Sequence, residues 1–295
     1  MALVLVAKYP TPGKSKTRLS AAVGSSETHN LANAFLLDTL CTLSNVELQS
    51  HTVQSHTVNA SQNVSKINKY VLYAPRSAEK KMRSLVNEAM DGMDPPLGRD
   101  EWTLLPMVDA DGLTSSQLTV KLKDGLEQVR SIEGDGAPVA FVGMDSPTLT
   151  SAEVAQSLEV AAKGKSYIKP AKDNGYVLIA LPGRVDGAVF EGVRWSCDET
   201  FSSQARRLCA FGEVVVGEPG FDIDEIDDLE ELYKILKADE EGKEFKLTRC
   251  RAELQKYEQK KLQRKKAKDR ATWLLWGMTL LGIGVAVAVG KGRTL

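Results

Sequence analysis

The sequence predicts an α/β fold in which a mostly parallel central sheet is flanked by helices. Short apolar runs typical of buried strands recur through the first 240 residues, and segments with helical periodicity lie between them. The composition is that of a globular protein, because 42% of the 295 residues are hydrophobic and 26% are charged. Strands that alternate with helices favour parallel pairing, since each helix returns the chain to the same edge of the sheet.

The elements are predicted in chain order as follows. The first strand is the wholly apolar run at residues 2–7, which is followed by a loop rich in proline, glycine and lysine. Further short apolar runs predict strands at residues 70–73, 102–108, 139–142, 167–169, 176–181 and 213–216. Helical patterns are found at residues 26–43, 78–89, 116–129, 151–162, 199–210 and 226–238. We therefore expect one α/β domain at residues 1–240.

Charge is distributed unevenly along the chain. Residues 243–270 contain 12 basic and 4 acidic residues, whereas residues 1–242 contain 24 basic and 35 acidic residues. Nucleic-acid-binding domains usually carry a positive surface, and the domain predicted here is acidic. Nucleic acid is therefore not an expected partner, and we interpret residues 241–270 as a basic helical stalk.

The segment after the stalk is predicted to be a transmembrane helix. Residues 271–290 contain no charged residue, and about 20 apolar residues are needed to cross a bilayer as a helix. Trp273 and Trp276 stand at its start, where interfacial aromatic residues are favoured. A buried core helix is the alternative, but basic residues flank the segment on both sides.

The positive-inside rule predicts that the basic stalk and the large domain face the cytosol. With only a short tail at residues 291–295, the expected arrangement is that of a single-pass, tail-anchored membrane protein. The helix would contact membrane lipid, and the basic stalk could attract anionic headgroups.

The four cysteines, at positions 41, 197, 209 and 250, are scattered and form no C-x-x-C pair. Neither a zinc site nor a disulfide framework is therefore expected.

The first candidate site is the loop after the first strand. It places Lys8, Gly13, Lys14, Lys16 and Arg18 at the carboxyl end of that strand. In doubly wound sheets this is the edge where anionic ligands bind, so the loop is a candidate nucleotide-binding element. A solvated basic loop is the simpler alternative.

A P-loop is a further interpretation of the same residues, because they include the triplet G-K-S. The P-loop pattern requires glycine where Lys8 stands. Pro10 and Pro12 also lack the amide donors that a phosphate cradle needs. These differences argue against a P-loop.

A second candidate is Asp145, which follows the predicted strand at residues 139–142. A carboxylate at the tip of a central strand is well placed to hold a divalent cation. It could instead cap the next helix, although Thr150 or Ser151 is the better cap because Pro147 intervenes. Asp109 and Asp111 form a D-x-D pattern as well, but the polar residues after Gly112 predict a loop, so we assign them no metal.

Two further carboxylate motifs follow. The sequence Asp-Asn-Gly at residues 173–175 predicts a turn between two strands, and it could also present Asp173 to a ligand. Asp222 and Asp224 are two residues apart, so they share one face if the chain is extended there. One of them could instead only cap the helix that follows.

Together, these motifs resemble the DUF2064 family of GT-A-like glycosyltransferases, some members of which are described as arsenosugar-biosynthesis glycosyltransferases. The family patterns are P-x-P-G-x-x-K-T-R-L, G-x-D-x-P-x-L, P-A-x-D-G-G-Y-x-L-I-G-L, W-S-T and D-I-D-x-x-x-D-L. The matches lie at residues 10–19, 143–149, 170–181, 195–197 and 222–229. Asn174 replaces a glycine and Cys197 a threonine of these patterns, and residues 113–118 lack the arginine of the family's L-G-x-R segment.

The resemblance implies a GT-A-like nucleotide-diphospho-sugar transferase fold and a metal-dependent glycosyltransferase. Its expected partners are a nucleotide-sugar donor and a small-molecule acceptor. Asp145, helped by Asp224 or Asp222, would hold Mg²⁺ or Mn²⁺, and Asp173 would position the acceptor or act as general base. The loop cations Lys14, Lys16 and Arg18 would contact the donor phosphates, with Lys8 and Gly13 completing the nucleotide site.

Two alternatives remain at this stage. The same fold resemblance extends to nucleotidyltransferases, which join a nucleoside triphosphate to a phosphorylated small molecule. The second alternative is a non-catalytic, membrane-tethered nucleotide-binding module. The departures from the family patterns at residues 113–118 and at Asn174 favour this alternative slightly.

Overall fold

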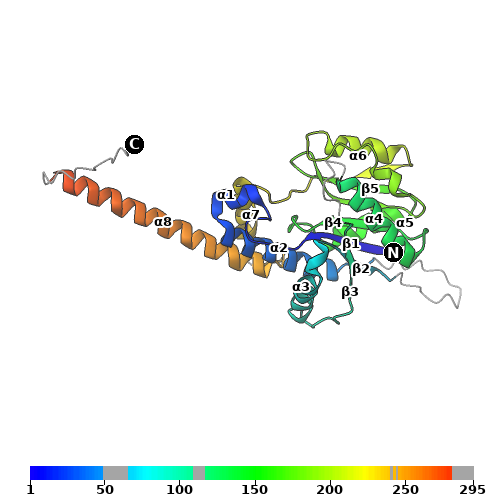
Figure 1. Ribbon diagram of the computed structural model, residues 1–295, viewed down its shortest axis with the longest axis horizontal. Coiled ribbons are helices and arrows are strands. Elements are labelled where there is room, and N and C mark those ends of the chain that lie inside the picture. Colours follow the sequence, from blue (N-terminus) through cyan, green and yellow to red (C-terminus); the bar gives the residue numbers. More distant parts are fainter. Residues whose placement is uncertain (49–65, 109–116, 240–241, 244, 281–295) are drawn as a thin grey trace, which may run out of the picture. The chain divides into compact units, whose positions relative to one another are not determined.

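The computed structural model describes residues 1–48, 66–108, 117–239, 242–243 and 245–280. In this part of the chain, strands form one seven-stranded sheet in the order β3-β2-β1-β4-β6-β5-β7 (Figure 1). The strands are β1 (Ala2–Lys8), β2 (Asn68–Ala74), β3 (Trp102–Pro106), β4 (Val139–Gly143), β5 (Ser166–Pro170), β6 (Tyr176–Leu181) and β7 (Val214–Val216). Each lies where the apolar runs predict a strand.

The sheet is mostly parallel, as predicted. β1 pairs in parallel with both β2 and β4, and the β2–β3 and β5–β7 pairs are parallel too. β6 is the exception, since it runs antiparallel to β4 and β5. The turn predicted at residues 173–175 produces this reversal, because it joins β5 directly to β6.

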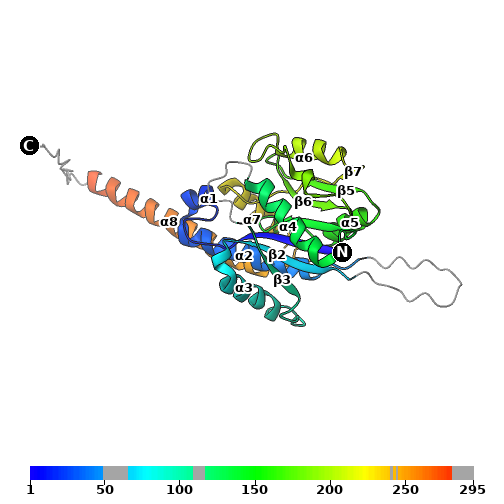
Figure 2. The same cartoon turned by 45° about the vertical axis from the view of Figure 1, so that its right-hand side comes forward.

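Helices cover both faces of the sheet (Figure 2). The helices are α1 (Thr17–Val23), α2 (Ser25–Ser44), α3 (Glu79–Asp91), α4 (Gln117–Glu133), α5 (Ser151–Ala162), α6 (Thr200–Cys209), α7 (Ile226–Ala238) and α8 (Thr248–Leu280). Short 3₁₀ turns lie at Arg76–Ala78 and Gly187–Phe190. The sequence patterns did not predict α1, which begins inside the expected loop.

Alternation along the strands builds two separate cores. In β1, Leu3 and Leu5 join the core beneath α2, α3 and α5, whereas Val4 joins the core beneath α4 and α6. Successive side chains of a strand point to opposite faces, so a strand covered on both sides must be apolar throughout. This requirement explains the unbroken apolar run at residues 2–7.

The sheet topology creates a crevice at the carboxyl ends of the central strands β1 and β4. The chain leaves β1 to build β2 and β3 on one side, and it then returns to place β4 on the other side of β1. The loops after β1 and β4 therefore diverge. Ligands of open α/β sheets bind at such a switch point, outside the carboxyl ends of the strands.

The chain divides into two compact units, Met1–Arg251 and Ala252–Leu295. Helix α8 includes most of the predicted stalk and continues into the predicted transmembrane segment as far as Leu280. Residues 281–290 of that segment lie outside the described part of the chain. Among the described residues, no helix is both long enough and apolar enough to cross a membrane.

The first turn of α8 is held by a carboxylate from α2. Asp38 is only 1% exposed, and its side chain accepts hydrogen bonds from the backbone N–H groups of Arg249 (3.3 Å) and Cys250 (2.8 Å). The Arg249 guanidinium also lies 3.4 Å from Asp38 Oδ1. Asp38 thereby satisfies amide donors that every helix N-terminus leaves unpaired.

We expect Asp38→Ala to lower the free energy of unfolding by about 1–3 kcal/mol, because buried donors would lose their acceptor. Urea denaturation of the full-length chain measures this change. Asp91→Ala is the matched control, since Asp91 pairs with Arg99 at the exposed surface and should cost less than about 1 kcal/mol. Equal effects of the two variants would contradict the role given to Asp38.

Candidate functional site

The site lies at the carboxyl edge of the sheet, where Lys16 bridges two carboxylates. The Lys16 Nζ atom is 2.8 Å from Asp145 Oδ2 and 2.6 Å from Asp224 Oδ1. These residues come from the loop after β1, the loop after β4 and the segment before α7. Three parts of the chain that are more than 75 residues apart therefore meet at the switch point.

Local backbone geometry sets the position of each charged group. Lys16 adopts a left-handed conformation (φ 50°) at the start of α1. At Gly143 a Cβ atom would lie 2.8 Å from Asp145 Oδ1, so glycine leaves room for that carboxylate. The Ile223 N–H donates to the Asp145 carbonyl oxygen at 3.0 Å, which ties the segment before α7 to the loop after β4.

Asp222 and Asp224 flank the fully buried Ile223 and both reach the same cavity, as their spacing predicts. Neither is the cap of α7. The N-cap residue is Glu225, which forms a reciprocal capping box with Asp228. Likewise Asp145 caps no helix, because Thr150 caps α5 with Glu153. The carboxylates at 145, 222 and 224 therefore have no capping role.

The electrostatics of the cluster depend on Lys16. Burial disfavours the Lys16 ammonium, but attraction to Asp145 and Asp224 outweighs this and raises the pKa of Lys16. Burial also opposes ionisation of Asp145, yet the charge of Lys16 and its hydrogen bond lower the pKa of Asp145. Burial, together with repulsion from Asp145, Asp173 and Asp224, raises the pKa of Asp222 to about 7.

Three carboxylates of this cluster could hold a metal ion. One oxygen from each of Asp145, Asp222 and Asp224 lies within 4.8 Å of the other two. Carboxylate oxygens are the ligands that Mg²⁺ and Mn²⁺ prefer. The residues present therefore fit the divalent cation that the family resemblance implies.

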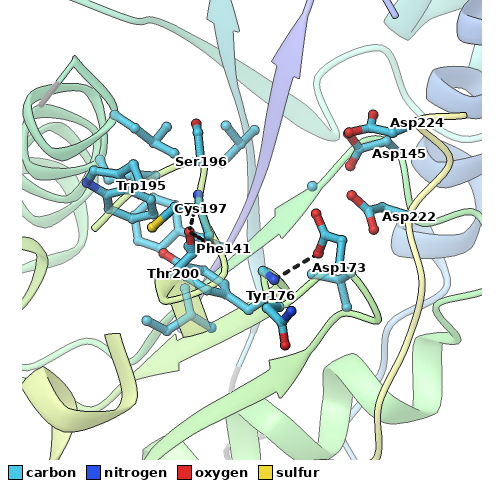
Figure 3. A pocket seen from close by; sticks show the side chains of 18 of the residues that line it. Phe141, Asp145, Asp173, Tyr176, Trp195, Ser196, Cys197, Thr200, Asp222 and Asp224 are labelled. Carbon is cyan, nitrogen blue, oxygen red and sulfur yellow. Dashed lines mark hydrogen bonds between the residues drawn. The ribbon is translucent and has the colours of Figure 1, made fainter. Parts of the chain in front are cut away.

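A cavity of about 660 Å³ extends from this cluster. Figure 3 shows that Asp145, Asp173, Asp222 and Asp224 lie at one end of it, while aromatic and small polar side chains lie at the other. The second end is formed by Phe141, Tyr176, Trp195, Ser196, Cys197 and Thr200 (Figure 3). Leu118 and Leu122 also line the cavity. Arg18 also lines this cavity, but its side chain is 72% exposed and lies 3.3 Å from Glu225.

Asp173 is held by its own turn. Its Oδ1 atom accepts a hydrogen bond from the Gly175 N–H at 2.8 Å, and the turn aims the side chain towards the other carboxylates (Figure 3). Asn174, which replaces a family glycine, has a left-handed backbone with φ 66°. Asparagine tolerates this conformation better than most residues, so the replacement is compatible with the turn.

A smaller cavity of about 330 Å³ lies on the other side of Asp145. Its wall is mainly apolar, with Val6, Ala32, Phe35, Met107 and Met144, and its charged lining consists of Lys8, Lys14, Lys16 and Asp145. Val6, Gly143 and Asp145 line both cavities. The two cavities therefore adjoin at the predicted metal site.

Residues 57–197 match the model of the family described as "Uncharacterized protein conserved in bacteria (DUF2064)". The resemblance to DUF2064 is confirmed over these residues, which include three of the five motifs, and the motifs at residues 10–19 and 222–229 lie outside the match. No curated protein matches the sequence significantly.

The chain is also similar to several solved structures. A candidate nucleotide-diphospho-sugar transferase from Desulfovibrio desulfuricans G20 is 21% identical, with a TM-score of 0.64 over 87% of this chain and 97% of that chain. A 4-diphosphocytidyl-2C-methyl-D-erythritol synthase from Anaerococcus prevotii DSM 20548 has 13% identity and a TM-score of 0.44, covering 80% and 96%. A nucleotidyl transferase from Methanothermobacter has 15% identity and a TM-score of 0.47, covering 81% and 98%. The first of these likenesses establishes a nucleotide-sugar-transferase-like fold.

The structure thus gathers the predicted site residues into two groups. Asp145, Asp173, Asp222, Asp224 and Arg18 line the larger cavity, and Lys8, Lys14 and Lys16 line the smaller one. Gly13 lines neither of these cavities; it lies in the loop with φ 69°. The D-x-D pattern at Asp109 and Asp111 lies outside the described residues.

The sequence did not predict the aromatic end of the larger cavity. Trp195 belongs to a motif that signalled the family, whereas Phe141 and Tyr176 belong to strands and give the pattern of an ordinary core. The ion pairs of Lys16 with Asp145 and Asp224 were also not predicted. Their partners are separated by 129 and 208 positions in the sequence, and no local pattern relates residues so far apart.

The raised pKa of Asp222 predicts that the contribution of this group to the stability of the metal-free protein is lost as the pH rises from about 4 to 8. The folded state binds this proton more tightly than the unfolded chain, so stability is greatest below the unfolded pKa and is lost through pH 7. In EDTA, Asp222→Asn should therefore be more stable than wild type at pH 8, by on the order of 1 kcal/mol after solvent screening.

Thermal unfolding of both proteins between pH 5 and 8 measures this difference. Asp198→Asn is a suitable control, since Asp198 is exposed and lines the same cavity outside the metal cluster. A difference between Asp222→Asn and wild type that does not grow with pH would contradict the prediction.

Proposed function

We propose that this protein is a metal-dependent glycosyltransferase, which moves a sugar from a nucleoside-diphosphate donor to a small, uncharged acceptor. The observation that carries the proposal is the pair of adjoining cavities with unlike chemistry. The smaller cavity has lysines and an apolar wall, and the larger cavity has carboxylates and an aromatic end. Asp145 lines both cavities.

The smaller cavity suits the nucleotide part of a donor. A planar base can bury its faces against apolar side chains such as Phe35, Met107 and Met144. The ammonium groups of Lys8, Lys14 and Lys16 supply positive charge for phosphates. Asp145, Asp222 and Asp224 would hold Mg²⁺ or Mn²⁺, which neutralises charge that develops on the leaving nucleoside diphosphate.

The larger cavity suits the sugar and the acceptor, and its charge argues against a phosphorylated acceptor. Its described lining contains one basic residue, Arg18, and five acidic ones, namely Asp145, Asp173, Asp198, Asp222 and Asp224. A bound divalent cation would still leave the lining net negative. The nucleotidyltransferase alternative considered above takes a phosphorylated small molecule as its second substrate, which such a cavity would repel. We therefore favour glycosyl transfer.

Asp173 is the candidate that would act on the acceptor. Its turn holds the carboxylate at the boundary between the acidic and aromatic ends of the larger cavity (Figure 3). An acceptor hydroxyl that lies against the aromatic end would approach Asp173 before it reaches the metal ligands. Asp173 would then orient this hydroxyl and take its proton as the new glycosidic bond forms.

The purified full-length chain should release a nucleoside diphosphate from one member of a panel of UDP-, GDP- and dTDP-sugars, in a reaction that needs Mn²⁺ or Mg²⁺ and stops in EDTA. Asp145→Asn should lower kcat/KM by about 10²–10³, because it removes a ligand from the cation that stabilises the leaving group. Chromatography of the released nucleotides measures the metal dependence of the wild-type reaction and the kcat/KM of the variant.

Asp198→Asn provides the matched control, since Asp198 lines the same cavity outside the metal cluster, and it should retain most of the activity. Release of pyrophosphate from nucleoside triphosphates would instead support nucleotidyl transfer. A folded protein that binds one of these nucleotides without turning it over would favour the non-catalytic module.

We also propose that residues 271–290 anchor the protein in a membrane with the catalytic domain on the cytosolic side. The support is the uncharged sequence of this segment and the basic residues before it. The donor and acceptor would then react close to the membrane surface.

The full-length chain should float with liposomes in a density gradient and remain bound in 1 M salt, because about 20 apolar residues would be embedded in lipid. The double variant Leu280→Arg, Val285→Arg should lose salt-resistant flotation, since each arginine costs about 2.5–3.5 kcal/mol near the centre of a spanning helix. Unchanged flotation of this variant would contradict the anchor.

A further inference from the structure

The Lys16 side chain contacts the carboxylate cluster and also lines the smaller cavity. Its ammonium bonds to Asp145 Oδ2 and Asp224 Oδ1, and its side chain is only 12% exposed. Lys16 also lines the smaller cavity together with Lys8, Lys14 and Ser15. It therefore lies at the boundary between the carboxylate cluster and the cavity assigned above to the donor phosphates.

The ammonium contacts the same carboxylates that could ligate a metal. Asp145 and Asp224 are two of the three residues whose oxygens lie within 4.8 Å of one another, and both are bonded to Lys16. A divalent cation on these oxygens would lie within a few ångströms of a positive charge. Two cations that close repel each other strongly in a partly buried site.

We propose that Lys16 is a resident counter-ion of the carboxylate cluster, and that a divalent cation displaces its ammonium from Asp145 and Asp224 towards the smaller cavity. This inference rests on the metal-dependent function proposed above. In the empty protein Lys16 offsets one of the two negative charges of Asp145 and Asp224. In the loaded protein the metal replaces it there, and Lys16 pairs with the donor phosphates instead.

The surrounding backbone allows this exchange with little rearrangement. The loop before Lys16 is closed by its own hydrogen bonds, from the Lys14 and Ser15 N–H groups to the Thr11 carbonyl oxygen and from the Thr11 N–H to Ser15 Oγ. A long, flexible lysine side chain can therefore change partners while the loop stays in place.

One consequence is that the metal and the donor diphosphate bind cooperatively. The metal releases Lys16 for the phosphates, and phosphates that hold Lys16 lower the cost of bringing in the metal. Linkage requires this coupling to be equal in both directions. Lys16 would thus position both ligands without touching the reacting carbon atom.

The test is a titration of the full-length protein with Mn²⁺ in the absence of nucleotide. Electron paramagnetic resonance measures the free ion at each step. Lys16→Met keeps the length of the side chain and removes its charge, so it should bind Mn²⁺ at least about tenfold more tightly than wild type. Lys16→Arg keeps the charge and should bind like wild type. Lys165→Met removes an exposed lysine that pairs with Glu213, and should also bind like wild type.

A second measurement uses the wild-type chain and does not depend on the folding of any variant. Acylation of lysines by an amine-reactive reagent, read by mass spectrometry, should be faster at Lys16 in Mn²⁺ than in EDTA. The rate at Lys14 should not change. Equal rates at Lys16 in the two conditions would overturn the proposal.

The outcomes separate this inference from the function on which it rests. Saturable Mn²⁺ binding by wild type, with equal affinity in Lys16→Met, would overturn the role of Lys16 and leave metal-dependent transfer intact. If neither protein binds Mn²⁺, both the metal site and the role of Lys16 are wrong.

Discussion

The candidate site depends on the compensation of negative charge at one edge of the sheet. Four aspartates converge there from three connections, and uncompensated carboxylates that are partly removed from water would repel one another. The Lys16 ammonium, 2.8 Å from Asp145 and 2.6 Å from Asp224, neutralises part of this charge. Asp222 shows what remains, since its pKa is raised to about 7 by burial and by its acidic neighbours. A site with this uncompensated negative charge is suited to bind a divalent cation.

The position of the cluster follows from the order of the strands. Because the chain builds β2 and β3 on one side of β1 and β4 on the other, the loops after β1 and β4 separate and leave a crevice. One loop contributes cations to the smaller cavity, and the other contributes Asp145 to both. The hydrogen bond from Ile223 to Asp145 brings the segment before α7 to the same place. The fold thus puts cations on one side of a shared carboxylate and acids on the other.

The departures from the family patterns have different structural weight. Asn174 occupies a backbone conformation that asparagine tolerates, so the turn that presents Asp173 is retained. At Cys197 the loop is held by backbone groups, because the Cys197 N–H and carbonyl oxygen both bond to the Thr200 hydroxyl. The Cys197 side chain lines the larger cavity, where it faces the space that we assign to the acceptor. The Cys197 thiol also donates to the Arg194 carbonyl oxygen at 3.5 Å, so Cys197 contributes both to the loop and to the lining of that space.

Sequence alone determined the elements and the kinds of residue available to the site. The seven strands, the alternation of helices, the turn at residues 173–175 and a cap at Thr150 or Ser151 follow from patterns within about ten residues, since local spacing reports which faces are buried. The structure assigns the cap to Thr150. The spacing of Asp222 and Asp224 likewise predicted that they share one face. Helix α1 was missed because its seven residues carry too short a pattern.

Only the tertiary structure decided which of these residues meet. The pairing of Lys16 with Asp145 and Asp224, the second cavity behind Asp145 and the aromatic end formed with Trp195 depend on strand order and on how the loops fold over the sheet. Contacts between residues more than a hundred positions apart leave no periodicity in a single sequence. The reversed strand β6 is an intermediate case, because the turn before it was predicted but its insertion between β4 and β5 was not. That insertion is set by the packing of the whole sheet, a physical constraint that no local segment contains.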